Sequence, residues 1–175
     1  MSNSATQPPF KVINVGGGLA GSLLANGLAR HNVNFEVYER QEKNSKREGY
    51  QIRLGEDTFI GMRACLDQDQ IDSISKHFGR YSNPAETRTT HKSSPVSRVI
   101  LQDALREPLD TMGKIHYQKK FKDFEICPGL HRDIVEVNFD DGTSDVCDIL
   151  LAADGNKSQV THLPFPHFYG FAYSF

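Results

Sequence analysis

The sequence predicts an α/β fold that opens with a parallel β-α-β unit and continues into an antiparallel β-hairpin. Apolar residues 10–15 lead into three consecutive glycines, and residues 19–31 carry apolar side chains at the spacing of one helix face. Apolar and polar residues then alternate over 135–139, which indicates a half-buried strand. The turn between the first strand and the first helix is therefore the segment on which the functional prediction depends.

The first half of the chain carries most of the helical signal. Residues 10–15 predict a strand, 19–31 a helix and 34–38 a second strand, which together make a minimal parallel crossover. Residues 55–78 have weaker helical spacing with a break near 66–68. Ser94 and Pro95 predict the cap and first turn of a further helix, because serine caps helices and proline fits their first turn.

The pattern changes after Gly113. Residues 116–126 predict an extended segment, and 135–139 a strand that ends in a turn over 140–143. The next apolar run, 146–152, predicts the returning strand of an antiparallel hairpin. The second half therefore does not continue as further βα units.

The turn after the first strand has the pattern G-x-G-x-x-G. Gly16 allows a tight exit from the strand, Gly18 lets a pyrophosphate approach the backbone, and Gly21 lets the helix pack closely on the sheet. The N–H groups at the helix start, at Leu19 and Ala20, would face the phosphates. Glycine-rich turns also occur without ligands, so the motif needs support from its surroundings.

Glu39 gives that support. It ends the second predicted strand 18 residues after Gly21, close to the spacing of about 20 at which a carboxylate reaches an adenosine ribose. A carboxylate there accepts hydrogen bonds from both ribose hydroxyls. The alternative interpretation is a solvated acid paired with its neighbour Arg40. The combination predicts a Rossmann-like dinucleotide site, without distinguishing FAD from NAD.

A second motif follows the hairpin. In "CDILLAADGNKSQV", residues 147–160, an apolar strand ends in Asp154 and Gly155. Together with the "GGGLAG" loop, "VYER", "GYQIRL" (49–54) and "VSRVILQDAL" (96–105), this motif resembles the FAD-dependent aromatic-ring hydroxylases, the p-hydroxybenzoate hydroxylase-like flavoprotein monooxygenases. The sequence is most similar to fungal members associated with secondary metabolism, and the resemblance covers about residues 10–163.

The resemblance implies FAD as cofactor and NAD(P)H as electron donor, with hydroxylation of an aromatic or polyketide-like small molecule by O2. By position it implies that Glu39, with Arg40 beside it, binds the adenosine ribose, that Arg98 contacts the cofactor, and that Asp154 and Gly155 belong to a second cofactor fingerprint. The stretch from Gly49 through Arg53 to Leu54 is implied to pass near the flavin.

Three of these residues have a second interpretation. Arg98 stands in the first turn of its predicted helix, where the helix dipole disfavours a cation, and no acid three or four residues on compensates it. One interpretation is that Arg98 binds an anionic ligand. The other is that Arg98 forms a tertiary salt bridge or faces solvent. Arg53 reaches substrate or flavin, or it is a solvent-facing strand residue. Asp154 binds cofactor, or it is a turn aspartate before glycine.

Composition excludes several classes of function. The formal net charge is −2, with charged residues spread along the chain, which gives no electrostatic case for nucleic acid. No run approaches the roughly 20 apolar residues of a membrane span. Cys65, Cys127 and Cys147 are odd in number and far apart, so we expect no disulfides and a cytoplasmic location. We expect no metal site, since His162 and His167 are separated by two prolines.

The chain departs from the family pattern in length. At 175 residues it is shorter than family members and lacks their third fingerprint, a Gly-Asp pair. We therefore expect a disordered start (1–9), an incomplete FAD-binding domain (10–163) and an aromatic tail (164–175), with a protein partner or a missing C-terminal half. The alternatives are a truncated, inactive FAD- or nucleotide-binding domain and an NAD-binding Rossmann oxidoreductase. No catalytic residue is predicted.

Overall fold

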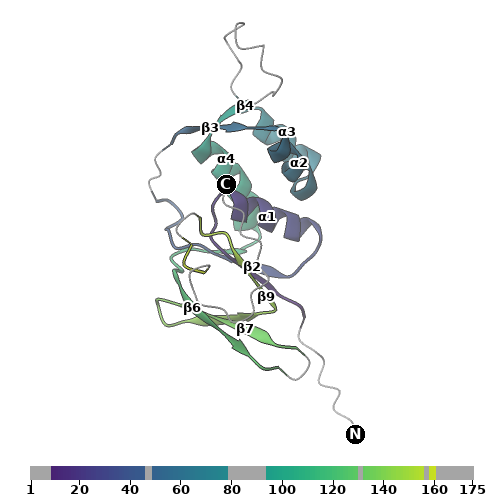
Figure 1. The fold of residues 1–175 in the computed structure, drawn as a ribbon. Helices are drawn as coiled ribbons and strands as arrows, with labels where there is room; N and C mark the ends of the chain where they lie inside the picture. The colour runs from purple at the N-terminus through teal and green to yellow at the C-terminus, as the bar shows by residue number, and fades with distance from the viewer. Residues whose placement is uncertain (1–8, 46–48, 79–93, 130–131, 156–157, 161–175) are drawn as a thin grey trace, which may run out of the picture.

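The computed structural model describes residues 9–45, 49–78, 94–129, 132–155 and 158–160 (Figure 1). The strands are β1 (Val12–Val15), β2 (Phe35–Tyr38), β3 (Gln51–Leu54), β4 (Ser94–Ser97), β5 (Ile115–His116), β6 (Phe121–Cys127), β7 (Ile134–Phe139), β8 (Ser144–Cys147) and β9 (Ile149–Ala152). The helices are α1 (Leu19–Arg30), α2 (Glu56–Cys65), α3 (Gln68–Ser75) and α4 (Arg98–Thr111). The predicted α/β fold is confirmed.

The strands form three sheets. A four-stranded parallel sheet has the order β5-β2-β1-β9, a three-stranded antiparallel sheet the order β6-β7-β8, and β3 pairs with β4. Val12 lies opposite Phe35 on β2 and opposite Ile149 on β9, both in parallel register. The predicted β-α-β crossover at the start of the chain is therefore present.

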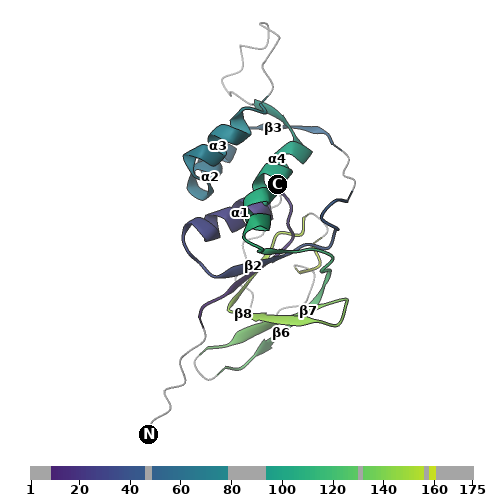
Figure 2. The same cartoon turned by 180° about the vertical axis from the view of Figure 1, so that it is seen from behind.

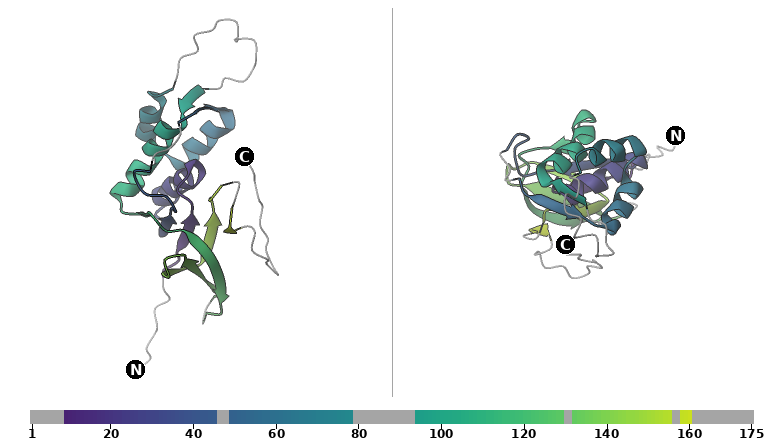
Figure 3. Two further views of the ribbon diagram at one scale, coloured as in Figure 1. Left: turned by 90° about the vertical axis from the view of Figure 1, so that its left-hand side faces the viewer. Right: turned by 90° about the horizontal axis from the view of Figure 1, so that it is seen from above.

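The parallel sheet is covered on both faces (Figures 1 and 2). Helices α1 and α4 lie on one face, and the antiparallel sheet lies on the other, as the side view also shows (Figure 3). Successive strand residues point to opposite faces, and the core follows this rule. Val12 and Val37 pack toward the helices with Leu109, whereas Ile13 and Val15 pack toward the antiparallel sheet.

A second helical layer packs outside α1. Helices α2 and α3 share an apolar cluster with β3, β4 and α4. The predicted break near 66–68 is confirmed and has a local cause. The Asp67 side chain accepts the N–H of Gln70 at 2.8 Å, and the Gln70 side chain accepts the N–H of Asp67 at 3.0 Å. This reciprocal capping box starts α3 afresh.

The prediction that Ser94 and Pro95 begin a helix is wrong. Residues 94–97 form β4, which pairs antiparallel with β3 and places Pro95 opposite Arg53. In the sheet that the structure describes, β4 pairs with β3 on one edge and with no strand on the other. Proline has no backbone N–H to donate, and it is tolerated in such edge strands. The helix begins three residues later than Pro95, at Arg98, after the N-cap residue Ser97.

The apolar run 146–152 is not one strand, contrary to the prediction. It divides at Asp148 into β8, which completes the predicted hairpin with β7, and β9, which joins the parallel sheet beside β1. The backbone N–H of Asp148 donates to the carbonyl of Lys11, and its carboxylate accepts the N–H of Lys11 at 2.7 Å. These bonds turn the chain from one sheet to the other. The extended segment 116–126 likewise divides between β5 and β6.

This topology brings three strand ends together. The carboxyl ends of β1, β2 and β9 lie at the same edge because the three strands are parallel neighbours. The chain leaves β1 toward β2 on one side, and β9 flanks β1 on the other. In open α/β sheets, such a point of reversal is where ligands bind.

Some predictions fall outside the described residues. These are nearly all of the 1–9 start, the 164–175 tail, and His162 and His167. In the described part of the chain no group of three or more His, Cys, Asp or Glu residues could hold a metal ion. No described helix has the length and apolar character needed to cross a bilayer. All three cysteines are unpaired.

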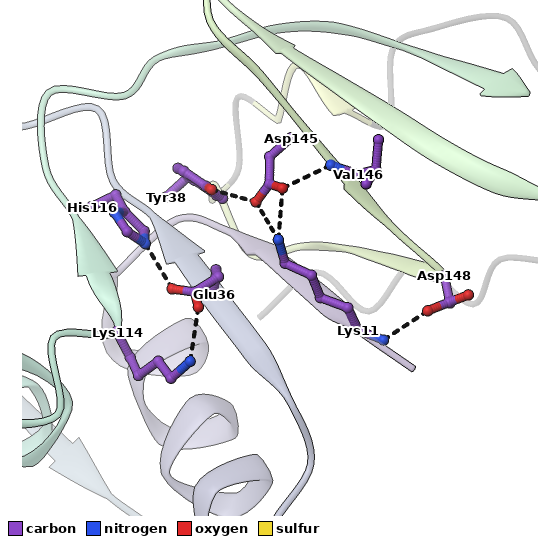
Figure 4. Close-up of polar contacts among 8 residues, drawn as sticks. All are labelled: Lys11, Glu36, Tyr38, Lys114, His116, Asp145, Val146 and Asp148. Atoms are coloured by element: carbon purple, nitrogen blue, oxygen red, sulfur yellow. Dashed lines mark hydrogen bonds and ion pairs between the residues drawn. The ribbon is translucent and has the colours of Figure 1, made fainter. Parts of the chain in front are cut away.

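A polar cluster joins the two sheets on the side away from the helices (Figure 4). Asp145 on β8 accepts the hydroxyl of Tyr38 at 2.5 Å and the ammonium of Lys11 at 2.6 Å. The Tyr38 ring stacks on His116 with ring centroids 4.8 Å apart. Burial would raise the pKa of Asp145, but its hydrogen bonds with Lys11 and Tyr38 outweigh burial and lower it.

The same cluster predicts alkaline sensitivity. Burial, and then the hydrogen bond to Asp145, raise the pKa of Tyr38 above its ordinary value of 10.0. Above that pH the unfolded chain loses the Tyr38 proton while the folded chain keeps it, so stability falls as pH rises. Urea unfolding should show this loss in the natural chain.

The variant Tyr38→Phe should reduce that alkaline loss, and it should cost about 1–3 kcal/mol at neutral pH because the hydrogen bond to a carboxylate is gone. Tyr50→Phe, at a tyrosine 60% exposed, is the matched control and should keep the alkaline profile of the natural chain. An unchanged profile in Tyr38→Phe would contradict the assignment.

Candidate dinucleotide site

A cavity of about 180 Å³ lies at the carboxyl ends of β1, β2 and β9. It is smaller than the roughly 300–1,000 Å³ pockets that enclose drug-sized ligands, so it fits part of a dinucleotide. Seven of the predicted site residues line it: Gly16, Gly18, Glu39, Arg40, Arg98, Asp154 and Gly155. The fold thus gathers residues that are up to 139 positions apart in the sequence.

The three glycines of the loop have different roles in the structure. A Cβ on Gly16, at φ +105°, would lie 2.4 Å from the carbonyl oxygen of Ala153, and one on Gly21 would lie 2.0 Å from that of Gly16. A Cβ on Gly18 would meet no atom within 4 Å. Gly16 and Gly21 are therefore required by packing, whereas the space at Gly18 is open to a ligand.

The start of α1 is built to receive an anion. Its N-cap residue is Gly18, which supplies no side-chain hydrogen bond to the helix, and the first turn holds no acid. The first N–H groups of a helix, here those of Leu19 and Ala20, lack intrahelical partners and carry the positive end of the dipole. Leu19 turns its side chain to the α2 cluster, and Ala20 is exposed.

Glu39 points at the glycine loop. It continues the alternation of Phe35 and Val37, which face the helices, and only 7% of it is exposed. Its Oε2 accepts the N–H of Gly17 at 2.9 Å. It forms its ion pair with Arg106, at 2.9 Å, so the interpretation of a solvated acid paired with Arg40 is wrong. Arg40 is exposed at the rim of the cavity.

Sequence reasoning missed two residues of α4. Gln102 lines the cavity and donates from Nε2 to the carbonyl of Gly17 at 3.1 Å, and Arg106 donates from Nε to the same oxygen at 2.7 Å. Both are nearly fully buried. The available signal was spacing: residues 98, 102 and 106 recur every four positions and so share one helix face. Besides Gln102, the prediction also did not include the cavity residues Val15, Tyr38, Gln41, Lys119, Lys120, Phe121, Ala153 and Gln159.

The structure gives the charge of the Arg98 side chain no acidic partner among the described residues, and the guanidinium lies 5.7 Å from the ring centre of Tyr50. Its backbone N–H donates to the carbonyl of Tyr50 at 3.0 Å. The side chain therefore stands on the cavity wall with its charge available to an anion.

Two acceptor oxygens on the cavity wall are buried without a described partner: Oε1 of Gln102 and Oδ1 of Asp154. The other carboxylate oxygen of Asp154 accepts the N–H of Gln159 at 2.7 Å, and Gly155 follows at φ +91°. Asp154 is thus a turn aspartate in the cavity wall whose second carboxylate oxygen has no described partner. A buried acceptor without a donor is costly, which favours a ligand donor there.

Gly49 and Arg53 are not brought to this cavity. Arg53 lies on β3 with an exposed side chain, and Gly49 precedes that strand next to Val99.

A larger, open groove of about 940 Å³ runs along another side of α4, bordered by Lys43, Asp103 and Tyr117 among others. None of the predicted site residues lines that groove.

Comparisons with known proteins agree with this geometry. Residues 15–64 match the NAD(P)-binding Rossmann-like domain model. The chain is 28% identical over 174 residues to the FAD-dependent monooxygenase dbaB of Emericella nidulans, covering 90% of this chain and 43% of that protein. It is 29% identical over 163 residues to the FAD-dependent monooxygenase thnD of Trichoderma harzianum, covering 85% and 39%.

A solved structure from Photorhabdus luminescens, assigned as an FAD-containing monooxygenase, superposes with a TM-score of 0.73 at 25% identity. The superposition covers 86% of this chain and 40% of that one. The chain is thus similar to part of several FAD-dependent monooxygenases. The predicted resemblance is confirmed, and the chain spans about two fifths of the length of these monooxygenase relatives, as expected for a portion of their fold.

The glycine loop predicts very different effects for two similar substitutions. Gly21→Ala should destabilise the protein by about 3 kcal/mol, because its methyl group overpacks the contact between α1 and the loop. Gly18→Ala should change the free energy of unfolding by less than about 0.5 kcal/mol, as for surface changes, because open space surrounds it. Urea unfolding of both variants checks this, and equal destabilisation would contradict the two roles.

Proposed function

We propose that this chain is the FAD-binding portion of a flavin-dependent monooxygenase. The observation that carries the proposal is the convergence of three strand ends on one cavity. The glycine loop follows β1, Glu39 follows β2, and Asp154 follows β9. We propose that this FAD-binding domain spans residues 10–163.

The residues present fit FAD. The open space at Gly18 and the N–H groups of the α1 start would hold the diphosphate, with Arg98 supplying positive charge. Glu39 would accept from the adenosine ribose. The unused oxygens of Gln102 and Asp154 would accept hydroxyl or N–H donors of the cofactor. Each of these four cavity features thus matches a group that FAD offers.

When bound, FAD would supply the redox chemistry by which substrate, NAD(P)H, one proton and one O2 give hydroxylated substrate, NAD(P)⁺ and water. The chain's own residues bind and orient the cofactor at the sheet edge. The antiparallel sheet packs beneath the parallel sheet, opposite the helices (Figure 1). This arrangement supports FAD over NAD alone, because a nicotinamide dehydrogenase fold continues with alternating strands and helices.

Substrate, electron donor and partner are also part of the proposal. On the resemblance to flavin-dependent hydroxylases, we propose an aromatic or polyketide-like small molecule as substrate and NAD(P)H as electron donor. Ile149 on β9, at an edge of the parallel sheet, is 43% exposed. An exposed apolar edge strand invites pairing with a further strand, so we propose this edge as the place where the rest of such a protein would pack.

The proposal is tested by titrating the purified chain with FAD. We expect saturable quenching of flavin fluorescence, and a visible flavin spectrum that survives gel filtration. Tighter retention of NAD than of FAD would contradict the proposal and favour a nicotinamide-binding domain. Oxygen consumption with NADH or NADPH then separates a catalytically competent chain, which a substrate stimulates, from one that only binds the cofactor.

Gly18→Ala sharpens this test because it separates binding from folding. Its methyl group would occupy the space proposed for the diphosphate, so FAD affinity should fall about 10- to 100-fold, as expected for an overpacked contact. The unfolding midpoint should stay unchanged. Unaltered FAD affinity in a folded Gly18→Ala protein would contradict the placement of the diphosphate.

A further inference from the structure

The carboxylate of Glu39 is almost fully occupied by the protein itself. Its Oε2 accepts two donors, the N–H of Gly17 and Nη2 of Arg106, each at 2.9 Å. Its Oε1 accepts the N–H of Gln41, also at 2.9 Å. A carboxylate oxygen offers about two acceptor positions. Oε2 is therefore full, and Oε1 keeps one position.

The position that remains is on the oxygen that bonds Gln41, a residue of the cavity wall. Glu39 and Gln41 both line the cavity, whereas Gly17 and Arg106 do not. The Oε2 side lies against the loop and α4, so we take the Oε1 side, next to Gln41, as the side that a ligand reaches. Only 9% of the Glu39 side chain is exposed, which leaves little surface for a second ligand contact.

Arg106 closes a ring with the glycine loop. Its Nη2 bonds Glu39, its Nε bonds the carbonyl of Gly17, and the N–H of Gly17 returns to Glu39. Its side chain is 3% exposed, and its guanidinium lies 5.7 Å from the ring centre of Tyr117. Arg106 thus fixes both the orientation of the carboxylate and the backbone of the loop, and it compensates the cost of burying the Glu39 charge.

We infer that Arg106 is a positioning residue that makes Glu39 an acceptor for one ribose hydroxyl rather than two. By filling Oε2, the arginine leaves Glu39 a single contact with the adenosine ribose. This inference rests on the proposed function, because the ligand is an adenosine-bearing dinucleotide. It replaces the expectation that both hydroxyls bond Glu39.

The test compares FAD with two analogues that lack either the 2′- or the 3′-hydroxyl of the adenosine ribose. In the natural chain, removal of one hydroxyl should weaken binding about tenfold or more, as for a lost hydrogen bond to a charged group. Removal of the other should weaken binding less than about threefold, as for a neutral contact. Dissociation constants from flavin fluorescence give both ratios.

Arg106→Met should free Oε2, so the two analogues should come within about threefold of each other. FAD itself should bind about tenfold less tightly, as for loss of a loop anchor. The analogue ratio is a readout that loss of stability alone does not change. The matched control is Leu109→Ala, a fully buried residue of α4 outside the cavity, which should lower stability and keep the ratio of the natural chain.

Two further variants keep the test valid if Arg106→Met folds poorly. Arg106→Met with Glu39→Gln removes both buried charges, and should restore folding while abolishing the preference between analogues. Arg106→Lys keeps the charge without the two-pronged geometry, and should restore the preference only partly. Equal dependence on both hydroxyls in the natural chain, or an unchanged preference in Arg106→Met, would overturn the inference alone. Failure of the natural chain to bind FAD would overturn the proposed function and this inference with it.

Discussion

The buried carboxylate of Glu39 is the contact on which the candidate site depends. It joins three segments that are distant in the sequence: the end of β2, the glycine loop after β1, and α4. A buried ionised carboxylate is tolerated only when charge and hydrogen bonds compensate it. Arg106 supplies the charge, and Gly17 and Gln41 supply N–H groups. The Glu39 carboxylate consequently links the loop to α4, in addition to the hydrogen bonds that Gln102 and Arg106 donate to the Gly17 carbonyl.

The parts of the site that could be predicted are those fixed by local sequence. Gly16, Gly18 and Gly21 follow a strand and open a helix within a few residues, so their backbone roles depend on short-range geometry. Glu39 could be placed because the length of α1 fixes its distance from the loop. Its partner could not, because the face that α4 turns to the loop depends on packing between elements 67 residues apart.

The errors in the fold have the same physical origin. Residues 146–152 form one apolar run, and nothing local shows that Asp148 is tied to Lys11 by bonds that send β9 into the other sheet. Ser94 and Pro95 fit a helix start equally well as a strand, and pairing with β3 decides between them. In each case a long-range hydrogen-bonding partner overrides a valid local preference.

Helix α4 shows how one element serves both stability and binding. Leu101, Leu105 and Leu109 recur every four residues and belong to the apolar clusters. Arg98, Gln102 and Arg106 recur with the same spacing, one position away, and turn toward the loop and the cavity. The two rows are adjacent on one helix. Because the leucines pack the helix into the core, the polar side chains of the neighbouring row are also held in a fixed position. A site that must hold a cofactor in a fixed orientation benefits from such support, because the packing that stabilises the domain also positions the groups that meet the ligand.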